Sequence, residues 1–566
     1  MLLVLWAAPV SAEPDFFGRG DRHAGPLSVV TAGTVLNFAV PLPTLLARGS
    51  TVIGVNGQGF SAGDLILIIA VSGSETWPDA GILDLSASQP GRWELARVAS
   101  VTMAQLQLTA PLDKSFDPPG VQVVRVPEYS QASISPGASV VASAWDGGTG
   151  GVVAMFVDGP LIVEGRVTAS GTGARGGAYR LSPNISGCVD GDAPFPEGAA
   201  RGEGLVLASY ATKVSGSNRA TTGGGGGICN DSGGGGGGHG AMGGNGGASY
   251  DGSRDVGGAG GARLLASFPN RLTFGGGGGS GWGNDNAGTS GGNGGGIVWI
   301  RAASLSGNGA IEANGATAAS ALSAPDDGLG GGGAGGSVLV QISGSAVCRS
   351  IEAGGGDGGN SFDGPTGPGG GGAGGRATLV ASTFAGCPVT AFAGLAGVAT
   401  GPFKPPSRGA HPTSAERATY GGVVATSDAG FLPPAPPVIV APAEAAQLPG
   451  GFEVRVSAAG ADSVWLRLDG TPSRIYADDA GVFTTFIDGG LVVGAHVLTA
   501  QSEAPGWRSS DSAPRTFFVP SGDAGTDGGT SSPRRLTVGC GCATVDSPAL
   551  LLMLVAFALR LTRVRS

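Results

Sequence analysis

The chain has little charge and little histidine. Asp, Glu, Lys and Arg make up 13% of its 566 residues, and the net charge is −10. No basic stripe interleaves with aromatic residues, as a nucleic-acid interface requires. The four histidines, His23, His239, His411 and His496, share no motif with a Ser or Cys nucleophile, and no Gly-x-Ser-x-Gly elbow precedes a helix. These absences exclude nucleic acid as a partner and predict no catalytic residues.

Motifs for metals and cofactors are also lacking. No CxxC pair or His-rich cluster suggests zinc, and the single stretch from Gly354 to Asn360 is a poor version of a calcium-binding nonapeptide array. The many Gly-x-Gly-x-x-Gly matches follow from the glycine content and lack the helix that a dinucleotide site needs. We therefore expect no metal, no cofactor and no enzyme activity.

One enzyme class stays open as an alternative. Parallel β-helices also host polysaccharide lyases, which need acid and base carboxylates on one strand face. Asp326 and Asp327 form the only adjacent acidic pair in the repeats described below. An exposed turn after Pro325 explains this pair more simply.

The residue that the chain has in excess is glycine. Its 111 glycines lie mostly between Gly147 and Gly375. Glycine does not recur strictly at every third position, which excludes collagen, and 41% of the residues are apolar, which fits poorly with plain disorder. Helical periodicity is nearly absent. We expect an all-β chain with a glycine-rich folded array at its centre.

Residues 1–12 form an apolar run that ends in Val-Ser-Ala, which is typical of a signal peptide cleaved before Glu13. The run is short and lacks a positive start, so a plain apolar N-terminus is the alternative. Six cysteines, an even number, suit disulfides in an oxidising compartment. We expect the protein to be exported.

Residues 29–129 have the pattern of a small β-barrel or sandwich. Short β-rich runs alternate there with Gly, Pro and Asp turns. The expected strands are Asp64 to Ile69, Trp93 to Val101, Leu106 to Leu108 and Val121 to Val126.

Residues 130–400 contain a repeat of about 40 residues. Gly296, Gly336 and Gly375 each precede a β-rich run and are 40 and 39 residues apart, and an earlier copy begins at Gly151. Each copy continues with a second strand of the form apolar-x-Ala-x-Gly, as in Ile311 to Gly315. Alternation with period two and glycine at the bends predict the stacked coils of a parallel β-solenoid.

Two points of geometry stay open at this stage. Each repeat is either two coils or one coil with a long glycine loop. The tracts Gly223 to Gly227, Gly233 to Gly238 and Gly275 to Gly279 either pack as extended glycine helices beside the solenoid or are mobile loops.

The cysteines of the repeats lie in register. Cys348 and Cys387 each lie twelve residues after an anchoring glycine, so stacked repeats place them within the separation that a disulfide tolerates. We predict this bridge, with two separate buried thiols as the alternative. Cys188 and Cys229 bracket the insertion between the first two copies and form a second predicted pair by elimination.

Residues 401–436 are predicted to be a Pro-rich linker, and residues 437–519 an Ig-like sandwich. The expected strands are Phe452 to Val456, Val464 to Leu468, Phe483 to Phe486 and His496 to Ala500. The order of the motifs, from Trp-Leu-Arg-Leu-Asp-Gly to Gly-Ala-His-Val-Leu-Thr-Ala, resembles bacterial Ig-like modules of surface proteins.

A flexible spacer at 520–538 precedes residues 539–566, in which Gly-Cys-Gly-Cys is followed by an apolar run and three arginines. This arrangement resembles the MYXO-CTERM sorting tail of myxobacterial surface proteins, whose Cys is processed and lipid-modified. The resemblance implies that Cys540 or Cys542 anchors the protein at the cell surface or outer membrane. A tail-anchored membrane helix is the alternative, although the run is short for a settled span.

Two stretches between Trp145 and Gly177, Trp-Asp-Gly-Gly-Thr-Gly-Gly-Val-Val-Ala and Gly-Arg-Val-Thr-Ala-Ser-Gly-Thr-Gly-Ala-Arg-Gly-Gly, resemble the AgmC-like glycine-rich proteins of adventurous gliding motility in myxobacteria. The similarity covers roughly residues 30–400. It implies a non-catalytic surface protein that acts in adhesion or gliding, with surface polysaccharide or other envelope proteins as partners. The alternative function is a surface glycan-binding or polysaccharide-degrading β-helix protein.

The predicted anchoring through residues 539–566 can be tested directly. Replacing both Cys540 and Cys542 with Ala removes every thiol that lipid modification could use in this segment. The variant protein is expected in the medium or in the inner membrane, as measured by immunoblotting of cell fractions. Retention of the double variant at the cell surface would contradict anchoring through these cysteines.

Overall fold

A computed structural model describes residues 17–73, 81–182, 188–192, 197–205, 214–248, 257–266, 270–323, 326–362, 366–399, 422–427, 436–448, 450–459, 461, 463–476, 482–488, 490–504, 507–508 and 511–520. The chain divides into two compact units, Met1–Leu432 and Pro433–Ser566. The described residues form strands and extended chain without a helix, so none of them belongs to a helix that could span a membrane. The predicted signal peptide and the tail from 539 to 566 lie outside the described residues.

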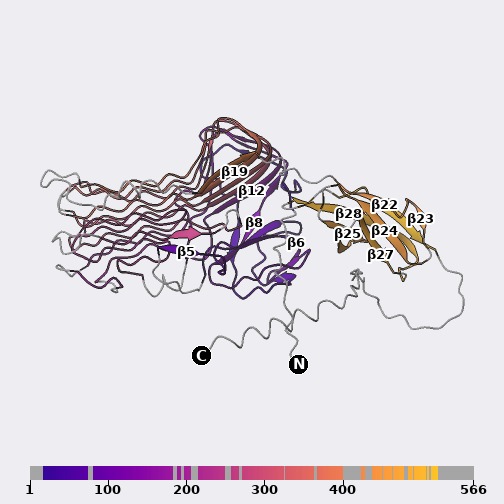
Figure 1. Ribbon diagram of the computed structural model, residues 1–566, viewed down its shortest axis with the longest axis horizontal. Helices are drawn as coiled ribbons and strands as arrows, with labels where there is room; N and C mark the ends of the chain where they lie inside the picture. The colour runs from indigo at the N-terminus through magenta and orange to yellow at the C-terminus, as the bar shows by residue number, and fades with distance from the viewer. Residues whose placement is uncertain are drawn as a thin grey trace, which may run out of the picture. The chain divides into compact units, whose positions relative to one another are not determined.

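The first unit is built on a parallel β-solenoid, as predicted (Figure 1). Its larger sheet has the order β1-β10-β12-β15-β17-β19-β21, and β9 also pairs with β12. A second parallel sheet has the order β11-β13-β16-β18-β20. The larger sheet consists of β1 (Pro26–Val29), β9 (Glu128–Tyr129), β10 (Gln131–Ile134), β12 (Val152–Val163), β15 (Ile297–Ser306), β17 (Ser337–Ala346), β19 (Arg376–Phe384) and β21 (Gly422–Ser427). The second consists of β11 (Ser139–Val141), β13 (Arg166–Thr168), β16 (Ala310–Glu312), β18 (Ser350–Glu352) and β20 (Val389–Thr390).

Side chains at alternate positions of the strands fill the space between these sheets. On β15, Val298 and Ile300 point inward and pack in one cluster with Ile311 of the second sheet. The alternate residues Ile297 and Trp299 point outward and belong to a separate buried cluster. Because the larger sheet is buried on both faces around the first halves of β12 and β15, residues 152–157 and 297–300 are apolar without alternation, as buried parallel strands usually are.

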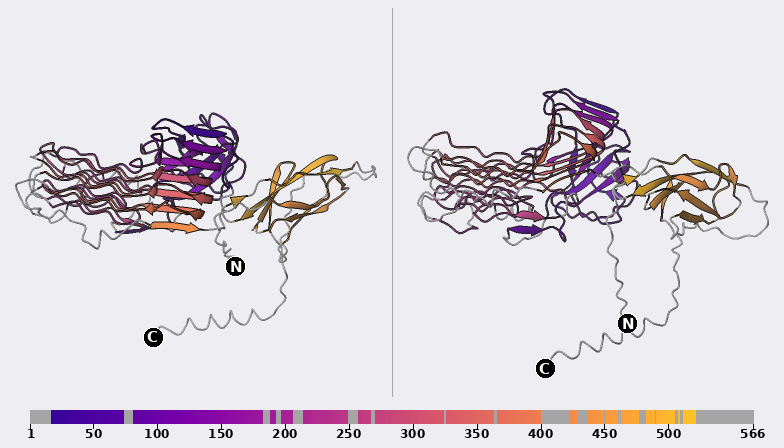
Figure 2. Two further views of the ribbon diagram at one scale, coloured as in Figure 1. Left: turned by 90° about the horizontal axis from the view of Figure 1, so that it is seen from above. Right: turned by 45° about the horizontal axis from the view of Figure 1, so that its top comes forward.

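Each repeat is one coil, which resolves the first open point. β15 and β16 of one coil lie beside β17 and β18 of the next, with Val298 opposite Val338 and Ile311 opposite Ile351. Figure 2 shows the strands stacked in a column, with extended chain running away from one end of each coil. In the coil of β15, residues 313–323 run outward and residues 326–336 return to β17.

The outward and returning tracts pack as extended glycine helices, which resolves the second open point for the described glycine tracts. In the tract from 234 to 238, Gly234 and Gly237 donate backbone hydrogen bonds to Leu329 and Gly332, whereas Gly235 donates to Gly225. Gly236 donates to Gly244 of a third tract. Successive residues thus bond in three directions and every third residue returns to the same neighbour, as expected of a left-handed helix with three residues per turn.

At most interior positions this lattice leaves no room for a side chain. A Cβ atom on Gly236 would lie 2.0 Å from the carbonyl oxygen of Gly371, and one on Gly278 would lie 2.0 Å from that of Gly331. A β-carbon that close to backbone would force the tracts apart. The glycine content of the chain is therefore a packing requirement.

An antiparallel sheet is inserted between β1 and β9 and corresponds to the predicted small β-barrel or sandwich. The sheet curls around its own core, and its order is β2-β8-β4-β6-β7-β3. Its other face, with Leu65 and Leu67, packs against Phe156 and Trp299 of the solenoid. The strands are β2 (Ala39–Pro41), β3 (Val52–Ile53), β4 (Leu65–Ala70), β6 (Trp93–Val101), β7 (Leu106–Leu108) and β8 (Val121–Val126).

Two short strands and one long-range pairing lie outside the predicted elements. β5 (Ile82–Asp84) pairs in parallel with β14 (Arg263–Leu265) of the glycine array. β21 falls within the segment predicted as a Pro-rich linker, yet it pairs with β19 from Arg376 to Ala381. The larger solenoid sheet therefore extends into the segment between 401 and 436.

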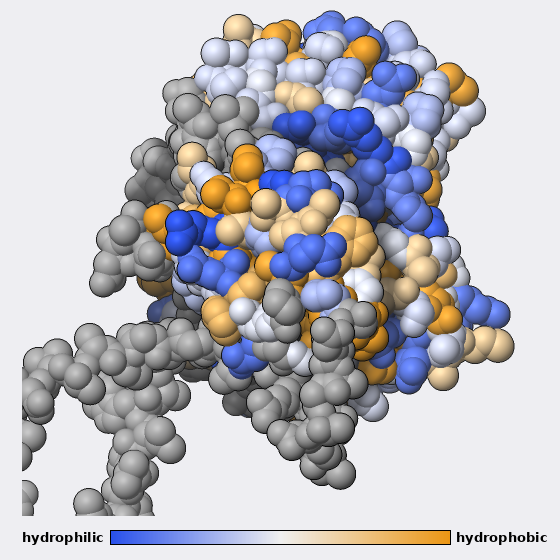
Figure 3. All heavy atoms as spheres, turned by 90° about the vertical axis from the view of Figure 1, so that its right-hand side faces the viewer, coloured by the Kyte–Doolittle hydropathy of each residue, from blue (hydrophilic) through white to orange (hydrophobic). Residues whose placement is uncertain are grey.

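The second unit is the predicted Ig-like sandwich. Its sheets have the orders β22-β24-β27 and β23-β30-β28-β25-β26, and one core cluster fills the space between them. The strands are β22 (Val438–Ala441), β23 (Ala446–Gln447), β24 (Phe452–Ser457), β25 (Ser463–Leu468), β26 (Thr471–Tyr476), β27 (Phe483–Ile487), β28 (Gly494–Ala504), β29 (Trp507–Arg508) and β30 (Arg515–Val519). On the side of the molecule seen in Figure 3, hydrophobic residues are interspersed with hydrophilic ones.

The close packing of the glycine tracts predicts the effect of one methyl group. Gly236→Ala is expected to destabilise the first unit by about 3 kcal/mol, because the new Cβ collides with backbone rather than with a movable side chain. Gly54→Ala is the control, since a Cβ there has no atom within 4 Å, and its effect is expected to stay below about 0.5 kcal/mol. Urea unfolding measures both; equal midpoints would contradict the packing constraint.

Candidate contact face of the solenoid

The second solenoid sheet and the tracts that continue it present one regular face to solvent. Val167, Ile311 and Ile351 point into the core, so their neighbours in each strand point outward. Beyond the strands, Gly315 and Ala318 donate to the carbonyls of Gly354 and Asp357, which keeps neighbouring tracts in register. We name the side chains on this side the ladder face; Glu312 is buried among them and the others are partly or fully exposed: Thr168, Ser170, Glu312, Asn314, Thr317, Ser320, Glu352, Asp357, Asn360 and Thr390.

The polar side chains of this face accept backbone hydrogen bonds that a further glycine tract would accept in the interior of the array. Thr317 Oγ1 accepts the N–H of Asp357 at 3.2 Å, and Ser320 Oγ accepts the N–H of Asn360 at 2.9 Å. One coil further, Asp357 Oδ1 accepts the N–H of Leu395 at 2.7 Å. An outermost tract has no glycine neighbour on its open side, and these oxygens satisfy the backbone donors that would otherwise remain unpaired.

Stacking of the coils also brings two carboxylates together. Glu312 and Glu352 are directly paired positions of β16 and β18. Arg166 donates to both oxygens of Glu312, at 3.1 and 2.9 Å, and Asn314 Nδ2 lies 3.4 Å from Glu352 Oε2. A pair of neighbouring carboxylates is what glycoside hydrolysis usually requires. Here, however, Glu312 is 4% exposed and held by Arg166, as expected of a structural ion pair.

Glu312 and Glu352 were not among the site residues predicted from the sequence. The signal was present, because Ile311-Glu-Ala and Ile351-Glu-Ala occupy the same position in successive repeats. A search for acidic residues adjacent in the sequence cannot find residues that stacking makes adjacent in space.

The expectation for Asp326 and Asp327 was wrong. The two residues are 4% and 0% exposed and do not lie in an exposed turn. Asp326 Oδ1 accepts the hydroxyl of Thr366 at 2.8 Å, and its other carboxylate oxygen accepts the N–H of Phe362. Asp327 Oδ2 accepts the N–H of Ala287 at 2.8 Å. Both carboxylates anchor neighbouring turns of the array and are buried because they satisfy backbone donors there.

Asp231 shares the surroundings of Asp327. Burial, followed by the negative charge and a hydrogen bond of Asp327, raises the pKa of Asp231 to about 7. Asp285 and Asp326 add to the same effect. A carboxyl next to another carboxylate retains its proton to higher pH because two neighbouring negative charges repel each other.

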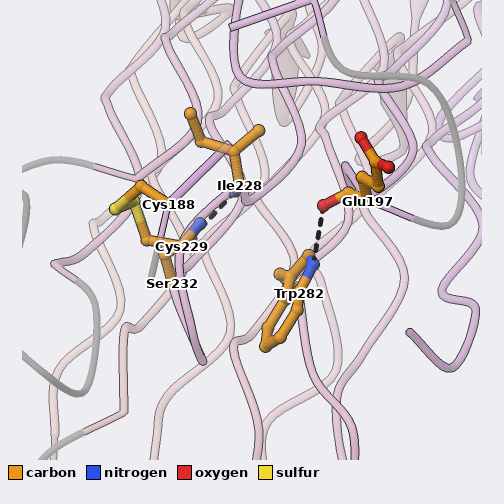
Figure 4. The surroundings of a disulfide bond; sticks show 6 residues. All are labelled: Cys188, Glu197, Ile228, Cys229, Ser232 and Trp282. Carbon is orange, nitrogen blue, oxygen red and sulfur yellow. Dashed lines mark hydrogen bonds between the residues drawn. A yellow bond between two sulfur atoms is a disulfide. The ribbon is translucent and has the colours of Figure 1, made fainter. Parts of the chain in front are cut away.

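Both predicted disulfides are present. Cys348 and Cys387 occupy equivalent places in successive coils, with a Cα–Cα distance of 4.6 Å. Cys188 and Cys229 are bonded with a Cα–Cα distance of 4.1 Å and close the insertion between the first two copies (Figure 4). Ser232 Oγ accepts the N–H groups of Ile228 and Cys229 beside this second bridge.

The predicted anchoring cysteines and the histidines complete the account of the candidate residues. Cys540 and Cys542 lie outside the described residues. His239 is fully buried against Thr273, and burial holds the pKa of its imidazole well below the usual value. Within the described ranges, no group of three or more His, Cys, Asp or Glu residues has the arrangement to hold a metal ion.

Comparisons with known proteins identify no family. No family model and no curated protein matches the sequence. Fibronectin(III)-like modules of Clostridium thermocellum CbhA are 13% identical, with 20% of this chain and 58% of that chain covered and a TM-score of 0.15. Chitinase ChiW of Paenibacillus sp. is 10% identical, with 70% and 23% covered and a TM-score of 0.13.

A bacteriophage protein is similar at the same level. The Gp54 tailspike of Acinetobacter baumannii phage AP22, solved with a capsular saccharide, is 10% identical, with 65% of this chain and 62% of that chain covered and a TM-score of 0.15. Scores this low carry no argument about function. The assignment of the solenoid rests on its own strand order and register.

The environment of Asp231 predicts a dependence of stability on pH. Its pKa is raised in the folded chain, so the folded state binds the proton more tightly than the unfolded state and stability falls as pH rises from about 4 to about 7. Glu94, whose pKa burial also raises to about 7, contributes with the same sign. Asp231→Asn keeps a donor for Asp327 and removes one of the two contributions. Unfolding midpoints at pH 5 and pH 8 should differ less in this variant than in the wild type; an unchanged difference would contradict the raised pKa of Asp231.

Proposed function

We propose that this chain is a non-catalytic adhesive protein of the bacterial cell surface and that its ladder face contacts polysaccharide. The observation that carries the proposal is the regular polar face on a closely packed scaffold. Each coil contributes polar side chains there, with hydroxyl, amide and carboxylate groups on the central coils, and a polymer of sugars offers donors and acceptors that recur along its length. Repeated weak contacts along one polymer add up to firm binding.

The charge of the ladder face favours a neutral polysaccharide. Its charged side chains are Glu312, Glu352 and Asp357, with Arg166 paired to the first of them. An acidic polysaccharide would be repelled by this excess of carboxylates. Neutral sugar hydroxyls, in contrast, can donate to carboxylates in charge-assisted hydrogen bonds.

Two disulfides support the exported location, because such bonds persist outside the cytoplasm. Anchoring by the tail and a part in gliding motility belong to the same proposal and rest on the resemblances of residues 539–566 and 145–177. An adhesion and gliding assay on a deletion strain tests this part.

Binding to dextran tests the role of the ladder face. Glu352→Gln together with Asp357→Asn removes two charges and leaves an oxygen to accept the N–H of Leu395. We expect about a tenfold loss of affinity, because charge-assisted hydrogen bonds to sugar hydroxyls are replaced by weaker neutral ones. The matched control is Glu453→Gln in the second unit, which should bind as the wild type does.

Two results would contradict the proposal. Equal dextran affinity in the double variant and the wild type would remove the ladder face as the contact surface. Steady release of new reducing ends from the polysaccharide would favour the polysaccharide-degrading alternative.

A further inference from the structure

A histidine connects the loop before β28 to the rest of the second unit. His496 lies near the start of β28, beside β25 (Figure 1), is 7% exposed, and stacks on Phe517 of β30 with 5.4 Å between the ring centres. Its Nδ1 lies 2.6 Å from Oδ2 of Asp469, which follows β25 in the turn to β26. Its Nε2 lies 2.6 Å from the carbonyl oxygen of Val492. The ring therefore bridges that turn and residues 490–493, which we name the latch loop.

Both ring nitrogens of His496 face oxygens that only accept hydrogen bonds. A carboxylate and a backbone carbonyl have no hydrogen to donate, and a neutral imidazole has one N–H. The neutral ring satisfies one of the two contacts, whereas the imidazolium donates to both. The hydrogen bond with Asp469 accordingly raises the pKa of His496 above its usual value of 6.5, against the opposing effect of burial, and the bond to Val492 adds to the rise.

Asp469 is the carboxylate that contacts the ring. Arg467 lies 2.9 Å from Asp511 instead, and Arg515 lies 3.8 Å from Glu444. The other charged residues on the neighbouring elements are Asp488, which precedes the latch loop, Arg474 of β26 and Glu503 of β28. Arg474 and Glu503 are paired with Trp465 and Ser463, toward the end of β25 that is far from Asp469.

Asp469 is held in place on β28 independently of the histidine. Its Oδ1 accepts the N–H of Val497 at 2.9 Å, and its own N–H donates to the carbonyl of Val497 at 2.9 Å. A hydrogen bond to a carboxylate is also about twice as strong as one to a neutral carbonyl. When His496 loses a proton, the N–H that remains therefore stays with Asp469, and Nε2 no longer binds the carbonyl of Val492.

The latch loop has the backbone of a segment that can turn outward. Gly490 and Gly494 flank it with φ angles of +114° and +142°, and a Cβ on either would have no atom within 4 Å. Glycine rotates through such conformations at low cost. Val492 and Val493 are 77% and 59% exposed, while Leu491 is partly buried against the sandwich core. Moving the loop therefore uncovers little apolar surface apart from Leu491.

We propose that His496 is a proton-dependent latch, which holds residues 490–493 on the sandwich as imidazolium and releases them as neutral imidazole. Because the pKa is raised in the closed state, the stabilisation is fully present below about pH 6.5 and is lost as pH rises to the raised value. The latch gives the second unit a response to pH that is independent of polysaccharide binding.

Two measurements on the full-length protein test the latch. Proton NMR follows the imidazole signals with pH, and the His496 signal is the one lost in His496→Gln. We expect its midpoint above pH 6.5. Hydrogen exchange of the peptide that contains residues 490–493, corrected for the intrinsic rate and measured by mass spectrometry, follows opening of the loop. Protection is expected to fall about tenfold per pH unit between pH 6.5 and the NMR midpoint and then to level off, because opening releases a proton in that interval.

A pair of carboxylate variants identifies the contact responsible. Asp469→Asn keeps the size of the side chain and removes its charge, so the His496 midpoint is expected to fall by about one pH unit. Protection of the latch loop should then be lost at correspondingly lower pH. Asp511→Asn is the matched control, because this carboxylate pairs with Arg467 and not with the ring. It should leave the midpoint and the exchange profile as in the wild type.

Three results would overturn the latch. These are a His496 midpoint at or below pH 6.5, loop protection that stays constant between pH 6.5 and the midpoint, and equal shifts of the midpoint in Asp469→Asn and Asp511→Asn. Thermal unfolding confirms that each variant is folded. If a variant unfolds, the exchange profile of the wild type decides, since a flat profile contradicts the latch without any substitution.

Discussion

Backbone hydrogen bonding in three directions is the constraint on which the glycine array depends. A sheet satisfies the backbone of each strand within one layer and leaves both faces free for side chains. In the array, successive residues bond to different neighbours on several sides, as Gly234, Gly235 and Gly236 do. Most interior positions leave no free direction for a side chain and are glycine, and small residues such as Ala334 and Ala373 occupy the few positions that have room. The low charge and the scarcity of large apolar residues in this region follow from the same geometry.

The solenoid provides the buried apolar surface that the glycine array lacks. Ordering glycine costs more backbone entropy than ordering any other residue, and an array without side chains buries little apolar surface to offset that cost. Each described excursion begins at a coil whose strands are already in register, as residues 313–336 do between β16 and β17. The Cys348–Cys387 bridge joins two of these coils. The apolar coils thus bring the tracts together, and the hydrogen bonds then complete the lattice.

The sequence predicted those parts of the structure in which side chains follow a regular pattern. Period-two alternation located β15, β17 and β19, and the equivalent positions of Cys348 and Cys387 gave their bond. The pairing of glycine tracts could not be predicted, because glycine has no side chain whose pattern would indicate register or direction. Asp326 and Asp327 were misplaced for a related reason. Acidic residues after a proline usually indicate an exposed turn. In the array, however, Asp326 and Asp327 are buried because they accept hydrogen bonds from backbone N–H groups.

A lattice held together mostly by its backbone also affects how long such a protein lasts outside the cell. Proteases bind an extended segment by pairing with its N–H and C=O groups and by inserting its side chains into pockets. In the interior tracts those backbone groups already bond to neighbouring tracts, and glycine offers no side chain to insert. The described interior tracts, whose composition resembles that of a flexible linker, are therefore expected to resist extracellular proteases.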